Sequence, residues 1–278
     1  MSTADESASS PLPRFSDRTL QALYAQSLRS QWSVEQVIDW PTVDLAAIHP
    51  LRRGHLARIY QDTLHAEKLG LELARRAVVS APEAGLRHLA TMQLRDESRH
   101  VAFFSRLCTS LEYHVDPSPE LVELKSSLQD VYDYDELLLH GHILEVAARA
   151  LFLTNAGRSM DALKRSVRLP GTNAMLSVLH VLTAHISEDE SRHIAFGHRC
   201  LRLRLKQVSS PAVRELERRA RATALFMYET FAAHSQSFQA FGLDPRTTLA
   251  GVWGAMRRTL DRLDLNIGHP PLSRANPS

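Results

Sequence analysis

Two stretches of the sequence are almost identical: DESRHVAF at residues 96–103 and DESRHIAF at residues 189–196 agree at seven of eight positions. Each lies inside a long segment whose apolar residues recur every three to four positions, which is the spacing of an amphipathic helix. A Glu and a His three residues apart on a helix project from one face and can bind the same metal ion. The repeat therefore predicts two half-sites on two different helices.

The helical face that carries each motif is mostly apolar or small. Steps of three and four residues from the first motif reach Leu86, Ala90 and Leu107, and the same steps from the second reach Leu179 and Ile186. A carboxylate buried on such a face without a partner costs several kcal/mol, so a cation must lie beside it. A metal ion is the expected cation.

A four-helix metal site needs one further carboxylate from each of two other helices. Glu67 lies in line with apolar residues such as Leu64 and Leu71, whereas Glu72 shares its face with charged residues and is expected to face water. Glu67 and Glu97 are both about 21–23 Å from the turn at residues 80–82, at 1.5 Å per residue. They are therefore level across an antiparallel helix pair.

Glu145 is the expected carboxylate of the third helix, because Leu138 and Ala148 flank it at helical spacing. It is level with Glu190 only if its helix crosses Gly157 and continues to about residue 164. Two alternatives stay open: Glu136 could be the ligand instead, or Glu145 could pair with Arg149 one turn away.

The expected ligands are four carboxylates and two imidazoles, which offset the charge of two divalent ions. One imidazole per ion among oxygen ligands suits iron or manganese better than zinc or copper. The proposed set is Glu67, Glu97, His100, Glu145, Glu190 and His193.

The rest of the chain predicts an all-α protein. Only 11 Gly and 13 Pro occur among 278 residues, and they fall mainly between segments with helical spacing. We expect one domain at residues 15–267, with disordered ends at 1–14 and 268–278. The helices are expected near residues 17–30, 51–79, 83–112, 120–160 (with a break near 132–134 left open), 173–207, 211–240 and 246–264.

Charge and composition argue against several classes of partner. The 33 basic and 31 acidic residues give a net charge of +2, which favours neither nucleic acid nor an anionic membrane. No apolar stretch is long enough to span a bilayer. The two cysteines and the absence of a signal-peptide pattern at the start predict a cytoplasmic protein.

The paired Asp-Glu-x-Arg-His motifs and the two single glutamates resemble the diiron-carboxylate oxidases and oxygenases, which include ribonucleotide reductase small subunits and p-aminobenzoate N-oxygenase-like enzymes. The resemblance covers residues 51–207 and implies a ferritin-like four-helix bundle core with additional flanking helices. It implies two iron ions, or one manganese and one iron. The segment QWSVEQVIDW at residues 31–40 also resembles the Trp-containing entry of reductase-like relatives, although its tryptophans are expected to be packing residues.

The resemblance also assigns roles to individual residues. One metal position would take Glu67, Glu97 and His100, and the other Glu145, Glu190 and His193. Asp96 and Asp189 would each orient a ligand histidine, with Arg99 and Arg192 paired to those aspartates.

Two departures narrow the choice of relative. Phe104 stands where common reductase subunits place a radical tyrosine, so a stored tyrosyl radical is not expected. Ile186 stands where the N-oxygenases carry an additional histidine, with His185 one position away, so a seventh ligand is not expected.

The expected function is therefore a non-haem diiron oxygenase or oxidase that uses O2 to hydroxylate, N-oxygenate or desaturate a small organic substrate. An external electron donor and a homodimer are further expectations. The alternatives are a ferroxidase or other iron-handling protein, and a relative with an inert metal site. The residues expected near a substrate pocket are Gly141, Ala148, Phe104, Phe152 and Gly197.

Overall fold

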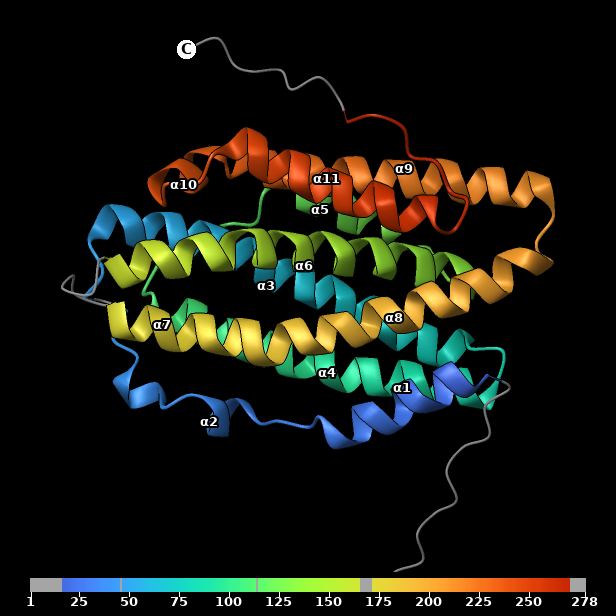
Figure 1. The fold of residues 1–278 in the computed structure, drawn as a ribbon, viewed down its shortest axis with the longest axis horizontal. Helices are drawn as coiled ribbons and strands as arrows, with labels where there is room; N and C mark the ends of the chain where they lie inside the picture. Colours follow the sequence, from blue (N-terminus) through green and yellow to red (C-terminus); the bar gives the residue numbers. More distant parts are fainter. Residues whose placement is uncertain (1–16, 46, 114, 166–171, 271–278) are drawn as a thin grey trace, which may run out of the picture.

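The computed structural model describes residues 17–45, 47–113, 115–165 and 172–270, and for residues 152–165 and 172–173 it describes the backbone alone. All regular structure in these ranges is helical, which confirms the all-α prediction (Figure 1). The α-helices are α1 (Arg18–Arg29), α2 (Val34–Val37), α3 (Pro50–Ser80), α4 (Ala84–Ser110), α5 (Pro119–Leu128), α6 (Tyr134–Arg165), α7 (Thr172–Val181), α8 (Ser187–Arg204), α9 (Ser210–Ala233), α10 (Ser235–Ala240) and α11 (Pro245–Asp261).

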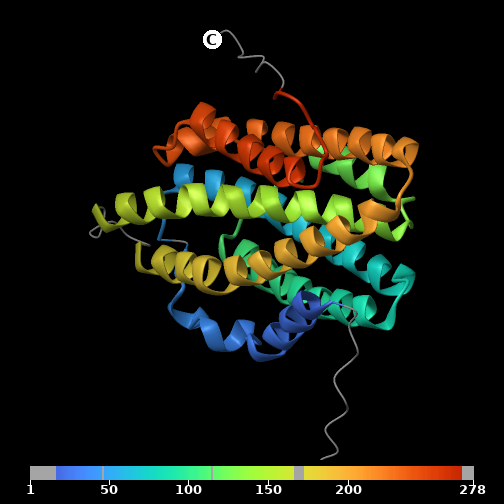
Figure 2. The ribbon, with the colours of Figure 1, turned by 45° about the vertical axis from the view of Figure 1, so that its right-hand side comes forward.

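Four long helices form the centre of the molecule. Helices α3 and α4 pack along each other as an antiparallel pair, and α6 packs along α8 in the same way (Figures 1 and 2). Helix α6 also packs against α3, so the two pairs close into one bundle. Proline near the first turn of α3, α5, α9 and α11 favours the start of each helix, since its missing N–H would have no partner there.

Helix α6 is buried on almost every side in its first half. All residues from Leu137 to Val146 are buried except Gly141, which is half-buried. Helices α3 and α8 cover two sides of α6, and α9 and α11 lie over the remaining side (Figure 2). A helix that is apolar all round belongs in the middle of a large domain, which explains why the flanking helices are needed.

The apolar core forms two clusters separated along the bundle. On α3, Tyr60 and Leu64 belong to one cluster and Leu69 and Leu73 to the other, and Glu67 lies between them. Helix α4 runs antiparallel and meets the two clusters in the reverse order, with Ala90 before Glu97 and His100 and with Phe103 after them. The polar centre therefore lies in the middle of the bundle, with apolar side chains at both ends.

The helix predictions agree with the structure, with four differences. The break before residue 134 is present, and α6 then continues across Gly157 to Arg165. The helix predicted at 173–207 contains a π-helical stretch, Leu182–Ile186, that separates α7 from α8, and it ends in a 3₁₀ turn at Leu205–Gln207. The helix predicted at 211–240 is divided at His234 into α9 and α10. Helix α2 and a 3₁₀ turn at Trp40–Thr42 are too short for a periodic pattern to reveal.

Residues 1–14 and 271–278 of the predicted disordered ends lie outside the described residues. Among the helices that are described, none combines the length and the apolar character needed to cross a bilayer. The homodimer and the cytoplasmic location stay predictions.

Candidate metal centre

The structure brings the six predicted ligands together at the middle of the bundle. They come from α3, α4, α6 and α8, and the most exposed of them, Glu67 and Glu145, are each only 7% exposed. Their donor atoms form two triplets, and within each triplet all atoms lie within 4.8 Å of one another. The triplets are Glu67, His100 and Glu190, and Glu97, Glu145 and His193.

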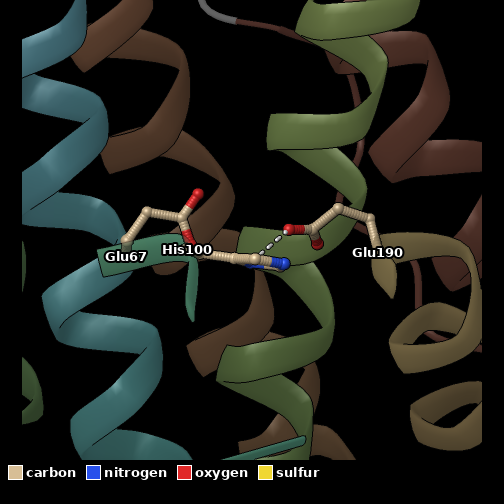
Figure 3. Close-up of side chains that lie close together, drawn as sticks. All are labelled: Glu67, His100 and Glu190. Atoms are coloured by element: carbon tan, nitrogen blue, oxygen red, sulfur yellow. Dashed lines mark ion pairs between the residues drawn. The ribbon is translucent and has the colours of Figure 1, made fainter. Parts of the chain in front are cut away.

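In the first triplet, carboxylates from two helices approach the same imidazole nitrogen. Nδ1 of His100 lies 3.4 Å from Oε2 of Glu67 and 3.4 Å from Oε1 of Glu190 (Figure 3). In the second triplet, Nδ1 of His193 lies 3.2 Å from Oε1 of Glu97 and 3.2 Å from Oε1 of Glu145. Each group offers an ion one nitrogen and two carboxylate oxygens.

The triplets differ from the grouping that the resemblance implies. Glu97 lies with the histidine of the second motif, and Glu190 lies with the histidine of the first. Oε2 of Glu97 is also 3.7 Å from Nδ1 of His100, so this carboxylate lies between the two triplets. Spacing along one helix identifies residues that share a face, but it cannot show which group a side chain meets across the bundle.

The aspartate of each motif likewise contacts the histidine of the other motif. Nε2 of His100 lies 3.2 Å from Oδ2 of Asp189, and Nε2 of His193 lies 3.1 Å from Oδ2 of Asp96. Each aspartate thus orients the histidine of the other motif, whose Nδ1 then faces the glutamates.

The motif arginines hold both aspartates. Arg99 donates to Asp96 of its own motif and, at 3.3 Å, to Asp189. Arg192 donates to Asp189 of its own motif and, at 3.2 Å, to Asp96. The two arginines therefore compensate the charge of the two aspartates, and the four glutamates need another source of positive charge.

Two further residues contact this network. Nε1 of Trp32 donates to Oδ2 of Asp189 at 2.8 Å, and its ring stacks on His100 with 6.2 Å between centroids. Trp32 is therefore more than the packing residue expected from the sequence. The amide of Gln93 donates to Oε1 of Glu145 at 2.8 Å. Gln93 stands one turn before Glu97, so the spacing of α4 is the signal that could have identified it.

Hydrogen bonding within the described structure leaves the ligand nitrogens unsatisfied. Nδ1 of His100 and Nδ1 of His193 are buried and have no hydrogen-bond partner there, and neither has Oε2 of Glu190. Unpaired buried polar atoms are costly and need an explanation. A divalent ion in each triplet would bind the histidine nitrogen of that triplet. The two ions together would offset the charge of the four glutamates, so the residues fit two metal ions.

The pKa values reflect the crowding of charge. Burial, followed by the neighbouring Glu97, raises the pKa of Glu145 to about 8. Burial alone would lower the pKa of His100, but Asp189 and Glu67 outweigh it and raise that pKa well above its usual value. The pKa of His193 is raised in the same way by Glu145 and Asp96. Without metal, the site therefore holds protons in place of metal ions.

Gly70 makes room for the central carboxylate. It lies on α3 one turn after Glu67, and a Cβ atom there would come within 3.3 Å of Oε2 of Glu97. Glycine inside a helix costs roughly 1 kcal/mol relative to alanine. The close approach of the Glu97 carboxylate explains why a small residue is needed at this position.

The alternative ligand assignments do not match the geometry. Glu136 pairs with Arg219 and lies 3.9 Å from His140, away from both triplets. Arg149 donates to Ser191, and Glu145 faces His193. Glu72 pairs with Arg75 and Arg76 at the surface, as expected.

The residues predicted near a substrate pocket are divided between several places. Ala148 lines a cavity of about 50 Å³ that also contacts Glu67, Glu97, Glu145 and Glu190. Gly141 and Gly197 line a second, smaller cavity beside His193. Phe104 is fully buried and packs on Tyr60. The side chain of Phe152 lies outside the described residues.

Comparison with known proteins gives the fold a context. No protein-family model and no curated protein matches the sequence. A Bacillus halodurans protein assigned to the class I ribonucleotide reductases matches the structure with a TM-score of 0.67 and 14% identity, over 91% of this chain and 96% of that one. Two variants of an R2-like ligand-binding oxidase with a Mn/Fe cofactor each match with a TM-score of 0.64 and 14% identity, over 89% of this chain and 93% of theirs.

The chain has the ferritin-like fold. The four central helices of this ferritin-like bundle are the ones that carry the two triplets. At 14% identity the likeness extends to the fold, and the roles of individual residues rest on the geometry above.

The pKa shifts at this site predict that rising pH destabilises the metal-free protein and strengthens metal binding. The raised pKa values of Glu145, His100 and His193 stabilise the metal-free fold at low pH, and this contribution is lost as pH rises through the folded-state values. We expect the melting temperature of metal-free protein to fall from about pH 6 to about pH 9, and the affinity for iron(II) or manganese(II) to rise over the same range because binding displaces protons. Calorimetric melting and metal titration measure the two trends. A metal-free protein that becomes more stable with rising pH would contradict the assignment.

Replacing Trp32 by Phe tests the contact to Asp189. The ring would still pack, but the N–H donor would be lost, and we expect metal affinity to fall roughly tenfold, as is usual when a hydrogen bond behind a ligand histidine is removed. Trp40→Phe is the matched control, because Nε1 of Trp40 donates to the backbone oxygen of Val34 instead. Equal metal affinities for the two variants would show that Trp32 only packs.

Proposed function

We propose that the chain is a dimetal oxidase that binds two iron ions, or one manganese and one iron, and uses O2 to oxidise a small organic substrate. The observation that carries this proposal is the pair of buried triplets, each with one unpaired imidazole nitrogen and two carboxylates. The ferritin-like fold supports it, since structural neighbours include a ribonucleotide reductase and an oxidase with a Mn/Fe cofactor.

The donor chemistry favours iron and manganese. Four carboxylates and two imidazoles give each ion mostly oxygen ligands, which suit iron and manganese. Ligand sets that select zinc or copper(I) are instead rich in thiolates. When bound and reduced, the two ions would supply electrons to dioxygen. The chain would fix their spacing through Glu97, which faces both triplets.

The surroundings of the triplets suit oxidative chemistry. Apolar clusters lie on both sides along the bundle and exclude water, which protects a reactive centre. Asp96 and Asp189 hold the imidazoles at fixed tautomers. Phe104, in the position of a radical tyrosine in common reductase subunits, cannot store a radical, so we favour direct oxidation of a substrate.

A substrate would bind in the cavity that Glu67, Glu97, Glu145 and Glu190 share with Ala148. Its remaining lining is largely apolar and comes mainly from α3, α6 and α9, with Leu121 from α5. In a hydroxylation, one oxygen atom of O2 would enter the substrate and the other would leave as water, which requires two electrons and two protons from an external donor. A desaturation would instead take two hydrogen atoms from the substrate, and with the same two electrons and two protons from the donor both oxygen atoms of O2 would leave as water.

Oxygen consumption tests this proposal directly. Protein loaded with iron(II) without oxygen should retain about two ions per chain and, once a reductant is present, consume O2 faster when a suitable organic compound is added. Glu97→Gln should abolish both the second ion and the stimulated uptake, whereas Glu72→Gln, which changes a surface carboxylate on α3, should alter neither. Uptake that depends on iron(II) alone, with oxidised iron accumulating, would indicate a ferroxidase instead.

A further inference from the structure

The cavity beside the metal site ends at a buried charged pair. Asp62 and His234 line it at the end away from the triplets, and they are 4% and 3% exposed. Asp62 lies five residues before Glu67 on α3, which corresponds to about 7.5 Å along the helix axis. His234 follows the last residue of α9.

Asp62 already has its partners. Oδ1 accepts the backbone N–H of Ser118 at 2.7 Å, and Oδ2 lies 3.0 Å from Nε2 of His234. Burial acts to raise the pKa of Asp62, but His234 and Ser118 outweigh it and bring that pKa below its usual value. Asp62 is therefore ionised near neutral pH, and the imidazole of His234 lies beside it.

His234 has an unused polar atom. Its Nδ1 is buried and has no hydrogen-bond partner in the described part of the chain. The hydroxyls of Thr63 and Thr230, which also line this end, donate to the carbonyl oxygens of Ile59 and Phe226. Oδ2 of Asp62 has no hydrogen bond in the described structure but keeps its 3.0 Å contact with Nε2 of His234, so Nδ1 of His234 is the atom that a ligand would find free.

We propose that His234, held by Asp62, anchors the hydroxyl group of a narrow aliphatic substrate and leaves the far end of its chain at the metal site. This inference rests on the proposed function and specifies the class of its substrate. A hydroxyl group can donate to Nδ1 of His234 or accept from it, and either hydrogen bond gives this buried nitrogen a partner.

The dimensions and charge of the cavity narrow the substrate class further. Its volume of about 50 Å³ is small and most of its lining is apolar, which suits a narrow alkyl chain. Asp62 is already a buried anion, so a carboxylate end group would add a second buried negative charge beside it. A neutral alcohol avoids this cost.

Calorimetric binding to metal-loaded protein without oxygen tests the anchor separately from turnover. Primary alcohols from butanol to octanol are compared with the 1-chloroalkanes of the same length, which keep the shape but accept hydrogen bonds poorly. We expect an alcohol of intermediate length to bind about tenfold more tightly than its chloroalkane, which is the upper range for one buried hydrogen bond. Repeating the titration on metal-free protein shows whether the preference is independent of the metal.

Two variants test whether the Asp62–His234 pair causes the preference for alcohol over chloroalkane. The double variant Asp62→Asn/His234→Leu removes the ring and the buried charge together, and it should bind alcohol and chloroalkane equally. The control is His140→Gln, because His140 is also a buried histidine that contacts α9, through Thr223, but it does not line this cavity. That variant should keep the full preference despite a comparable loss of stability.

The outcomes separate this inference from the proposed function. An equal affinity of wild-type protein for alcohol and chloroalkane, or an unchanged preference in the double variant, would overturn the anchor even if O2 is consumed. A preference that disappears in the double variant supports the anchor even if no oxidation is found. Under turnover, oxidation at carbons remote from the oxygen end group is expected, and oxidation at the carbon that bears it would contradict the proposed orientation.

Discussion

The structure depends on the concentration of negative charge at the centre of the bundle. Six carboxylates, from Glu67, Asp96, Glu97, Glu145, Asp189 and Glu190, are buried together where water cannot screen them. Arg99 and Arg192 compensate the two aspartates, which leaves four glutamates beside two histidines. Such an arrangement is stable only with protons or metal ions between the side chains, because an uncompensated buried charge costs several kcal/mol.

This constraint accounts for several features of the fold. Apolar clusters at both ends of the centre fix the four helices, so that the glutamates meet at one level. Gly70 leaves room for the Glu97 carboxylate at the expense of helix propensity. The aspartates and arginines of each motif contact those of the other, and these polar contacts join α4 to α8. The two helices pack less closely on each other than α4 packs on α3 or α8 packs on α6. The same network reaches outward through Trp32.

Much of the fold and of the candidate site could be predicted from the sequence, because helical periodicity and a repeated motif can be recognised within single helices. Helical faces predicted Glu67, Glu97, Glu145 and Glu190 as ligands, and level spacing from one turn supported the pairing of Glu67 with Glu97. Contacts between helices could not be predicted in the same way. The exchange of Asp96 and Asp189 depends on how α4 and α8 face each other, and the contact of Trp32 with Asp189 joins residues 157 positions apart. The Asp62–His234 pair was missed because neither residue belongs to a repeated pattern.

The central claim is that two metal ions lie side by side between the four helices. Anomalous diffraction from crystals grown with iron and manganese, recorded at the absorption edge of each metal, measures this directly. The account predicts two adjacent peaks, one among Glu67, His100 and Glu190 and the other among Glu97, Glu145 and His193. A single peak, or metal bound only at surface carboxylates, would contradict it.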